Sequence, residues 1–261
     1  MDITSIVGNV LAIVLLVSGI GIARVGNFID PGSLLIVAFG TMAAIIIAFP
    51  LEVLKQVPKH MKIMFLKSPF EPMYYIDQLE EMAVMARKNG LLALEEKAND
   101  MEDPFMQTGL MLIVDATAPE KVKEFLDTDL ENTADRHAAA IALYSKAGEF
   151  APGLGMIGTL IGLINMLMGL DLTAGPGNLT GDMGVAMITT FYGSVMANLM
   201  FLPMANKLSL KNDDELLCKQ IIIEGVLAIQ EGENPKFLKE KLIAFLPNHM
   251  KNADKKGGGE E

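Results

Sequence analysis

The chain has 261 residues, of which 51% are apolar, with 19 methionines, 24 glycines and no tryptophan, a composition that favours lipid-packed helices over an ordinary globular core. The formal net charge of -11 argues against nucleic-acid binding, and a single cysteine excludes an internal disulfide. A membrane protein is therefore the first class to test.

Four stretches are long enough to cross a bilayer, which takes about 20 mostly apolar residues. None of them contains a Lys, Arg, Asp or Glu. The first is not a cleaved signal peptide by its pattern, because Asp2 stands where a basic residue is expected and a second span follows at once. The sequence thus predicts an all-α, polytopic membrane protein with transmembrane helices at about residues 3–22, 33–51, 150–170 and 183–202.

The basic residues predict the topology. The two short loops, between the first and second spans and between the third and fourth, hold only Arg24. Segment 52–149 carries eleven basic residues and the segment after 205 carries nine. By the positive-inside rule both long segments are cytoplasmic. Four crossings then place the N- and C-termini in the cytoplasm of a multi-pass inner-membrane protein.

The cytoplasmic parts are expected to be helical. Apolar residues recur at helical spacing from Ile76 to Ala86, and Gly90 ends the run. Pro119 opens a further helix that leads toward the third span, and the tail offers another at 212–230. The expected domains are a transmembrane pair at 1–51, a cytoplasmic helical domain at 52–149, a second transmembrane pair at 150–205, and a cytoplasmic tail at 206–261 that is disordered from about 248.

No soluble-type active site is visible. The three histidines, at 60, 137 and 249, lack ligand spacing, so we expect no metal site, and the absence of a phosphate-binding loop or a nucleophile beside a base predicts no enzyme and no tightly bound cofactor. A protein that moves ions normally keeps an ionisable residue at membrane depth. The four spans lack one, so either the chain is no transporter or another chain supplies the carboxylate.

Small and hydroxyl-bearing residues recur four apart in the third and fourth spans. Gly155, Thr159 and Gly162 share one face of the third span at helical spacing, and Thr190 belongs to a row of residues four apart in the fourth, beside a second row that begins at Thr189. Small residues at this spacing let helices approach closely. The hydroxyls either bond their own helix backbone or line a path for a partner helix or an ion, and spacing alone leaves both interpretations open.

Two prolines stand at the inner ends of these spans. Pro152 and Pro203 each remove a backbone donor from a helix. Each marks either a kink where the membrane meets the cytoplasm or a simple helix boundary.

Five segments resemble the MotA/PomA family of flagellar stator A subunits, and the resemblance covers nearly the whole chain. They are FAPGLGMIGTLIGL at 150–163, AMITTFYG at 186–193, PMANKL at 203–208, EGVLAIQEGENP at 224–235 and ARKNGLLALEE at 86–96. The resemblance implies a pentameric ring of A subunits around the helices of a B-subunit dimer of the MotB/PomB type. The B subunit would carry the ion-binding aspartate, which would explain spans without an acid.

The resemblance further implies that the ring converts ion flow into torque on the rotor protein FliG. The family has rotor-facing charges and coupling prolines at positions that match residues of this chain. For the charged segment 86–96, spacing alone favours a different interpretation, a solvated pair of helices. The rotor-facing residues are Arg87, Lys88, Glu95 and Glu96, and the coupling prolines are Pro152 and Pro203.

The coupling ion is predicted from three threonines. Sodium-type members resemble this chain in having Thr159 and the pair Thr189 and Thr190, whereas proton-type members tend to have alanine at 159 and 189. Sodium must exchange its water for oxygen ligands, which threonines supply. We predict sodium, with a proton as the alternative.

Two rival functions share part of this pattern. A ring subunit of the ExbB/TolQ type, which energises outer-membrane processes, has three spans rather than four and lacks the charged segment at 86–96. A structural scaffold without ion passage would leave the threonine rows and paired prolines as packing features.

Overall fold

The computed structural model describes residues 3–66, 68–171, 175–176, 179–247 and 251. Within this part the fold is all-α, as predicted, apart from two short antiparallel strands, β1 (Leu170–Asp171) and β2 (Gly175–Pro176). The disorder predicted from about residue 248 concerns residues that, except for Lys251, lie outside the described part.

The chain divides into two compact units. Unit 1 comprises Met1–Lys67 and Ala138–Ser209, and unit 2 comprises Ser68–His137 and Leu210–Glu261. The domain boundaries expected from the sequence fall after residues 51, 149 and 205. Two of the three boundaries between the units fall within long helices, because α9 (Pro119–Met168) and α11 (Leu202–Glu231) each contribute residues to both units, and the third falls between Lys67 and Ser68. The domain boundaries drawn from the sequence stay predictions.

Unit 1 contains the predicted membrane spans. By length and composition three helices qualify, and a fourth qualifies if the bent pair Ile6–Ile20 and Ile22–Phe28, which meets at 95°, counts as one span. The three are Pro31–Ala48, Pro119–Met168 and Leu179–Glu231. Besides its parts of α9 and α11, unit 1 contains α1 (Ile3–Ile20), η1 (Ile22–Phe28), α2 (Pro31–Leu34), η2 (Leu35–Phe39), α3 (Gly40–Ala48), α4 (Leu51–Leu54), α5 (Val57–Phe65), α10 (Leu179–Val195) and η4 (Met196–Phe201).

The ends of the first two spans follow from local residues. The first helix stops at Ile20 rather than residue 22, because Gly21 has a φ of 84° that a right-handed helix does not allow. The second begins at Pro31, and the side chain of Asp30 caps it by accepting a hydrogen bond from the Ser33 amide at 2.6 Å.

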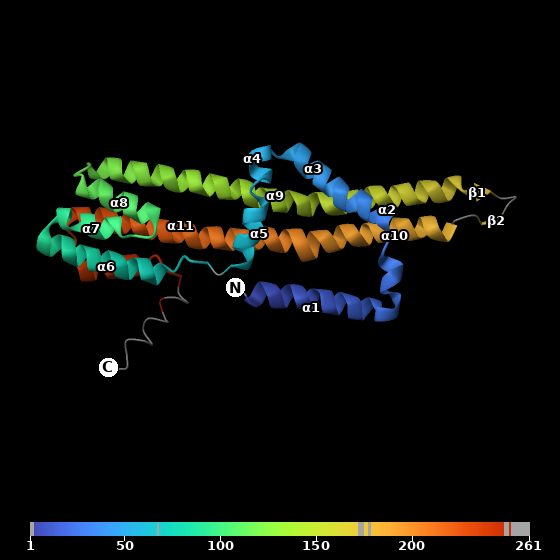
Figure 1. Cartoon of the computed structure of the whole chain (residues 1–261), viewed down its shortest axis with the longest axis horizontal. Helices are drawn as coiled ribbons and strands as arrows, with labels where there is room; N and C mark the ends of the chain where they lie inside the picture. The colour runs from blue at the N-terminus through green and yellow to red at the C-terminus, as the bar shows by residue number, and fades with distance from the viewer. Residues whose placement is uncertain (1–2, 67, 172–174, 177–178, 248–250, 252–261) are drawn as a thin grey trace. The chain divides into compact units, whose positions relative to one another are not determined.

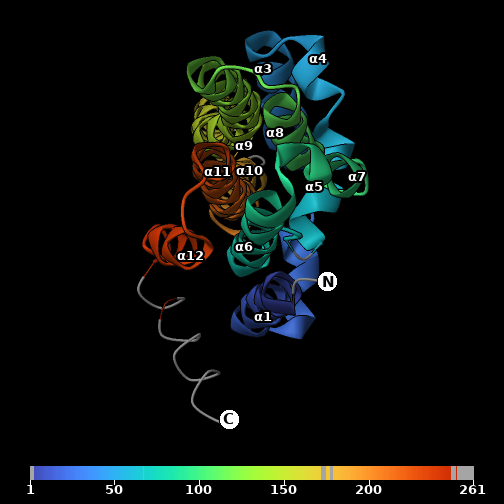
Figure 2. The same ribbon diagram turned by 90° about the vertical axis from the view of Figure 1, so that its left-hand side faces the viewer.

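Unit 2 is a helical bundle, shown end-on in Figure 2 with α12 next to α6. The expected helix from Ile76 to Ala86 lies within α6, and Gly90 follows its last residue with a φ of 84°. Two helices were not predicted, α8 and α12. Besides its parts of α9 and α11, unit 2 contains α6 (Pro72–Asn89), η3 (Leu91–Ala93), α7 (Leu94–Asn99), α8 (Pro104–Val114) and α12 (Pro235–Ile243).

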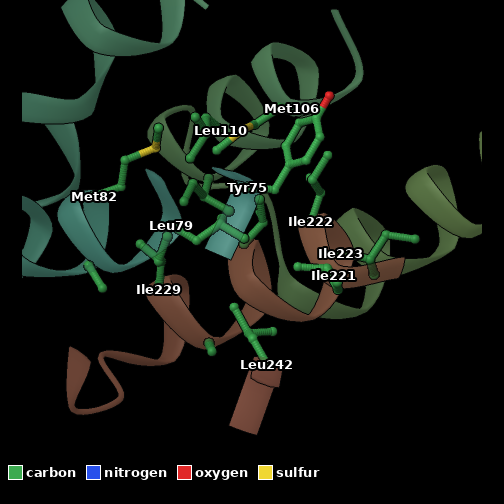
Figure 3. Close-up of a cluster of buried hydrophobic side chains, with 14 of the residues drawn as sticks. Tyr75, Leu79, Met82, Met106, Leu110, Ile221, Ile222, Ile223, Ile229 and Leu242 are labelled. Atoms are coloured by element: carbon green, nitrogen blue, oxygen red, sulfur yellow. The ribbon is translucent and has the colours of Figure 1, made fainter. Parts of the chain in front are cut away.

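The core of unit 2 is built from apolar side chains of α6, α7, α8, α9, α11 and α12, and Figure 3 shows part of it. Leu79 of α6, Leu110 of α8, Ile222 of α11 and Leu242 of α12 are all completely buried. Burying one such side chain contributes about 1.5–3 kcal/mol. Met82 and Ala83 bring the last turns of α6 into this core, just before the charged segment begins.

Candidate functional site

The helices α9 and α10 run side by side in unit 1 and touch through glycines (Figure 1). A Cβ atom added at Gly158 would lie 2.4 Å from Thr189 Cγ2, and one added at Gly162 would lie 2.7 Å from the Asp182 carbonyl oxygen. From the other side, a Cβ at Gly193 would lie 2.6 Å from the Ala151 carbonyl oxygen. No side chain fits at these three positions, so the helices approach closely, and at Gly162 and Gly193 their backbones are in direct contact.

Three threonine hydroxyls converge on one backbone carbonyl at this contact. The Ala186 carbonyl oxygen lies 3.0 Å from Thr159 Oγ1, 3.1 Å from Thr189 Oγ1 and 3.2 Å from Thr190 Oγ1. The hydroxyl oxygens of Thr159 and Thr190 are 2.5 Å apart. Four oxygen atoms from two helices are therefore gathered in one place.

The three hydroxyls differ in exposure. Thr190 is exposed, Thr159 is half-buried, and Thr189 is completely buried against Gly158. Thr189 also donates to the Val185 carbonyl of its own helix at 3.0 Å. The structure thus brings Thr159 and Thr190 together at the open side of the helix pair and places Thr189 behind them.

A hydroxyl that donates to a backbone carbonyl still has lone pairs to offer. Thr159 reaches the Gly155 carbonyl of its own helix at 3.1 Å as well as atoms of α10. The hydroxyls therefore bond the helix backbone, which is the first interpretation of these rows, and their oxygens keep lone pairs. That the rows line a path for an ion or a partner helix stays a prediction. The Ala186 carbonyl was not predicted from the sequence, although its position four residues before Thr190 is the usual one for a back-bonded threonine.

The two prolines occupy different settings. Pro152 lies inside α9, which continues through it, and its Cα would be 3.1 Å from a Cβ on Gly193 of α10. Pro203 is the second residue of α11 and follows the π-helical turn η4 directly. A proline has no N–H for the carbonyl four residues earlier, and a wider π-helical turn is one way to accommodate that loss.

A tyrosine of α10 fixes the entrance to the second span. The Tyr192 hydroxyl donates to the Phe28 carbonyl at 2.5 Å and accepts from the Asp30 amide at 3.1 Å. These bonds hold the connection before α2 against α10. Sequence reasoning gave no signal for this contact, which joins residues more than 160 positions apart.

The four charged residues of segment 86–96 are all exposed in unit 2. Arg87 and Lys88 belong to the last turn of α6, and Glu95 and Glu96 to the first turn of α7. Helix dipoles favour cations at C-termini and anions at N-termini, so these charges suit their own helices. None of the four makes an ion pair within the part of the chain that the structure describes, and their contact with a rotor protein stays a prediction.

Comparisons with known proteins place these features in a family. The model of the MotA/TolQ/ExbB proton channel family matches residues 97–220. Motility protein A of Treponema phagedenis is 37% identical over 248 residues, which cover 94% of each chain. The chain belongs to the MotA/PomA family. Chemotaxis protein PomA of Vibrio alginolyticus is 36% identical over 248 residues, covering 94% of this chain and 96% of its own.

A solved structure agrees over the full length. The flagellar MotAB stator complex from Bacillus subtilis contains a chain that matches with a TM-score of 0.88 and 33% identity, covering 99% of this chain and 100% of that one. The resemblance inferred from the five segments is therefore confirmed. The family is one of helical membrane proteins that act as channel and motor components and are not enzymes.

Proposed function

We propose that this chain is the A subunit of a flagellar stator and forms, with a MotB/PomB-type dimer, an ion-conducting complex that applies torque to FliG. The carrying observation is the cluster of Thr159, Thr190 and the Ala186 carbonyl between α9 and α10. A motility protein A and a chemotaxis protein PomA match along nearly their whole length, which favours a stator over an ExbB-type subunit.

The proposed assembly is a ring of five copies around the B-subunit helices. The predicted spans contain no carboxylate of their own, so an ion that crosses needs an acid from the partner. The excess of basic residues in the long segments supports an inner-membrane orientation with both termini in the cytoplasm. Unit 2 would then face the rotor.

Sodium is the proposed coupling ion. Thr159 and Thr190 offer oxygens beside a backbone carbonyl, and such oxygens can replace the water that a metal cation loses on entering a narrow path. A proton path needs no such ligands. We propose that the ion binds a B-subunit carboxylate next to these two threonines, neutralising it and allowing the ring to step.

Swimming speed against external sodium tests this proposal. In a host without its own stator, complemented with this chain and its B subunit, Thr190→Ala should raise the sodium concentration for half-maximal speed by about tenfold, equivalent to ~1.4 kcal/mol of binding. Thr128→Ala is the control, because Thr128 is also exposed and bonds its own helix, at 2.7 Å from the Glu124 carbonyl, but lies in unit 2. Speed that is indifferent to sodium in the unmodified chain would make this a proton motor.

The rotor contact is tested separately. Arg87→Glu should lower motility while the complex with the B subunit still assembles, because exposed charges contribute only about 0–1 kcal/mol to folding. Lys121→Glu changes an equally exposed charge at the start of α9 and should leave motility unchanged. Loss of assembly in Arg87→Glu would show a structural role instead.

A further inference from the structure

The short helix α5 of unit 1, Val57–Phe65, runs across α9 and not along it (Figure 1). α9 contains the third predicted span and therefore follows the direction in which the chain crosses the bilayer. A helix that runs across α9 consequently follows the plane of the membrane. Only α4 separates α5 from the second span, so the chain cannot carry α5 far from the bilayer.

The packing of α5 sets its depth. Its side chain Met64 belongs to one apolar cluster with Ala147 of α9 and Met204 of α11. The ring of His60 lies edge to face against that of Tyr144, with centroids 6.0 Å apart. Tyr144 stands six residues before the predicted third span and Met204 two residues after the predicted fourth, about 9 and 3 Å along a helix. The headgroup layer is about 5–8 Å thick, so α5 lies at the height of the lipid headgroups.

The face of α5 that points away from this cluster carries lysines. Lys59 and Lys62 are exposed and, three residues apart on a helix, share one face. Lys55, between α4 and α5, is exposed as well. None of the three ammonium groups is ion-paired to a carboxylate of a described residue. Glu52 is the one acid in residues 51–66, so this segment is basic in a chain whose net charge is -11.

Exposed apolar side chains flank the lysines of α5. At 100° per residue, Ile63 lies on one side of the row formed by Lys59 and Lys62, and Phe65 lies on the other. Ile63 is 38% exposed, Phe65 is 36% exposed, and Leu66, directly after the helix, is 46% exposed. A helix that combines lysines with exposed apolar side chains is typical of segments that lie in the surface of a membrane with anionic lipids.

We propose that α5 binds the headgroups of anionic phospholipids in the adjoining membrane leaflet. Lys59 and Lys62 contact the phosphates, while the apolar side chains beside them enter the layer where the acyl chains begin. The proposed orientation makes this the cytoplasmic leaflet, whose surface potential is negative. A free phosphate would pair with the lysines but leave the apolar side chains in water, so a phospholipid satisfies the whole face. The proposal depends neither on the coupling ion nor on a rotor protein.

Photolabelling from lipid to protein tests this contact at the helix itself. The purified complex of this chain with its B subunit is placed in phosphatidylcholine nanodiscs that contain increasing fractions of phosphatidylglycerol with a diazirine in its acyl chain. Cleavage after Glu52 and Glu71 releases residues 53–71, which contain α5, for mass spectrometry. Diazirine-bearing phosphatidylcholine with the same acyl chains is the control lipid. The unmodified complex should be labelled in this peptide at a much lower fraction of phosphatidylglycerol than of phosphatidylcholine.

Replacing two lysines should remove this preference. Lys59→Gln combined with Lys62→Gln should raise the phosphatidylglycerol fraction for half-maximal labelling by about thirtyfold, equivalent to ~2 kcal/mol. Lys121→Gln combined with Lys123→Gln is the matched control, because it removes the same charge from exposed positions of α9 in unit 2. This control should label like the unmodified complex. Labelling of 53–71 that is equal for the two lipids, or undiminished in the α5 variant, would overturn the proposal.

A variant that keeps the charge separates lipid binding from folding. Lys59→Arg combined with Lys62→Arg should retain the preference for phosphatidylglycerol, since both charges remain beside the apolar side chains. Loss of the preference in this variant too would show that the lysines act through local structure. Soluble glycerol 1-phosphate in excess should not reduce the labelling. Displacement of the lipid by it would show a site for free phosphate instead.

A second copy of this chain is the other candidate to cover α5. In that case the peptide 53–71 would be shielded from both photoactivatable lipids. Native mass spectra of the same complexes would then show fewer copies of the chain in Lys59→Gln combined with Lys62→Gln. We expect the number of copies to be unchanged and the peptide to be labelled, and either opposite result would overturn the assignment to lipid.

Discussion

The contact between α9 and α10 in unit 1 and the core of unit 2 bury opposite kinds of residue. Between α9 and α10 the buried positions are small, as at Gly158 and Ala186, while the large side chains of Met156 and Leu160 are 63% and 59% exposed. In unit 2 the arrangement is reversed, and side chains such as Leu79 are completely buried.

The difference follows from the solvent on each side. In water, burying a large apolar side chain stabilises the fold by about 25 cal/mol per Å² of apolar area. In lipid that gain vanishes, because hydrocarbon surrounds the side chain either way, and helices associate through close backbone contact and hydrogen bonds. Enlarging a residue should therefore damage unit 1, and shrinking one should damage unit 2.

The largest effect on motility is expected from enlarging a contact glycine. Gly193→Ala would put a Cβ 2.6 Å from the Ala151 carbonyl oxygen, so α9 and α10 must separate, and overpacking of this kind costs about 1–3 kcal/mol or more. We expect loss of motility and less assembled complex on native gels. Gly184→Ala is the matched control, because a Cβ at Gly184 of the same helix meets nothing within 4 Å. Equal behaviour of the two variants would contradict the close contact.

The opposite change is expected to damage unit 2. Leu79→Ala should destabilise it by about 2–5 kcal/mol, since it removes a completely buried side chain and leaves a cavity. Leu92→Ala, at a residue that is 73% exposed, should stay within about 0.5 kcal/mol. A comparable loss in both variants would show that this core does not hold unit 2 together.

A built-in thiol reports on this unfolding. Cys218 is the only cysteine of the chain and is completely buried in the same core. Burial raises the pKa of its thiol to about 12, with Asp214 and Asp103 contributing, so little thiolate exists at neutral pH until the unit opens. Labelling of Cys218 by a thiol reagent, located by mass spectrometry, should be fast in Leu79→Ala and slow in Leu92→Ala.

The sequence predicted what depends on periodicity and hydropathy. Long apolar runs without charged residues predicted the membrane spans, and the helical spacing of apolar residues from Ile76 to Ala86 predicted α6. The starts of α8 and α12 carried signals that were not used, because Asp103-Pro104 and Asn234-Pro235 are each a capping residue followed by proline. Both helices are short, and a periodic pattern is hard to recognise over so few residues.

The candidate site was predictable only in part. The spacing of polar residues singled out Thr159, Thr189 and Thr190. Adjacent residues on a helix point about 100° apart, so Thr189 and Thr190 cannot both lie at the open side of the helix pair. The Ala186 carbonyl has no side-chain signature.

A smaller effect is expected from the link between α6 and α8. The Tyr75 hydroxyl donates to Asp103 Oδ2 at 2.7 Å, and Asp103 Oδ1 accepts from the Phe105 amide at the start of α8. Burial, and then this hydrogen bond, raise the pKa of Tyr75 far above its usual value, so the hydroxyl remains a donor at any working pH. Tyr75→Phe should cost about 1.5 kcal/mol, whereas Tyr74→Phe, at an exposed ring, should cost little. Hydrogen exchange of the α8 amides measures both.

The smallest effect is expected at the surface contact between α12 and α6. Lys239 Nζ lies 2.8 Å from Asp77 Oδ1 and 2.9 Å from Glu80 Oε2. Because these groups are partly exposed and screened by water, Lys239→Met should cost only about 0.5–1 kcal/mol. Lys236→Met, at an exposed lysine of the same helix, should cost less.

The pH dependence of this contact has a definite sign. The hydrogen bonds to Asp77, and then to Glu80, raise the pKa of Lys239 above its ordinary 10.5. The folded state therefore holds this proton more tightly than the unfolded state, so the contribution is complete below about pH 10.5 and is lost as pH rises through the folded pKa. The stability difference between the unmodified chain and Lys239→Met, followed by hydrogen exchange of the α12 amides, should be constant from pH 7 to 10 and shrink at higher pH. A difference that stayed constant above pH 10.5 would mean that the lysine acts through packing of its stem and not through its charge.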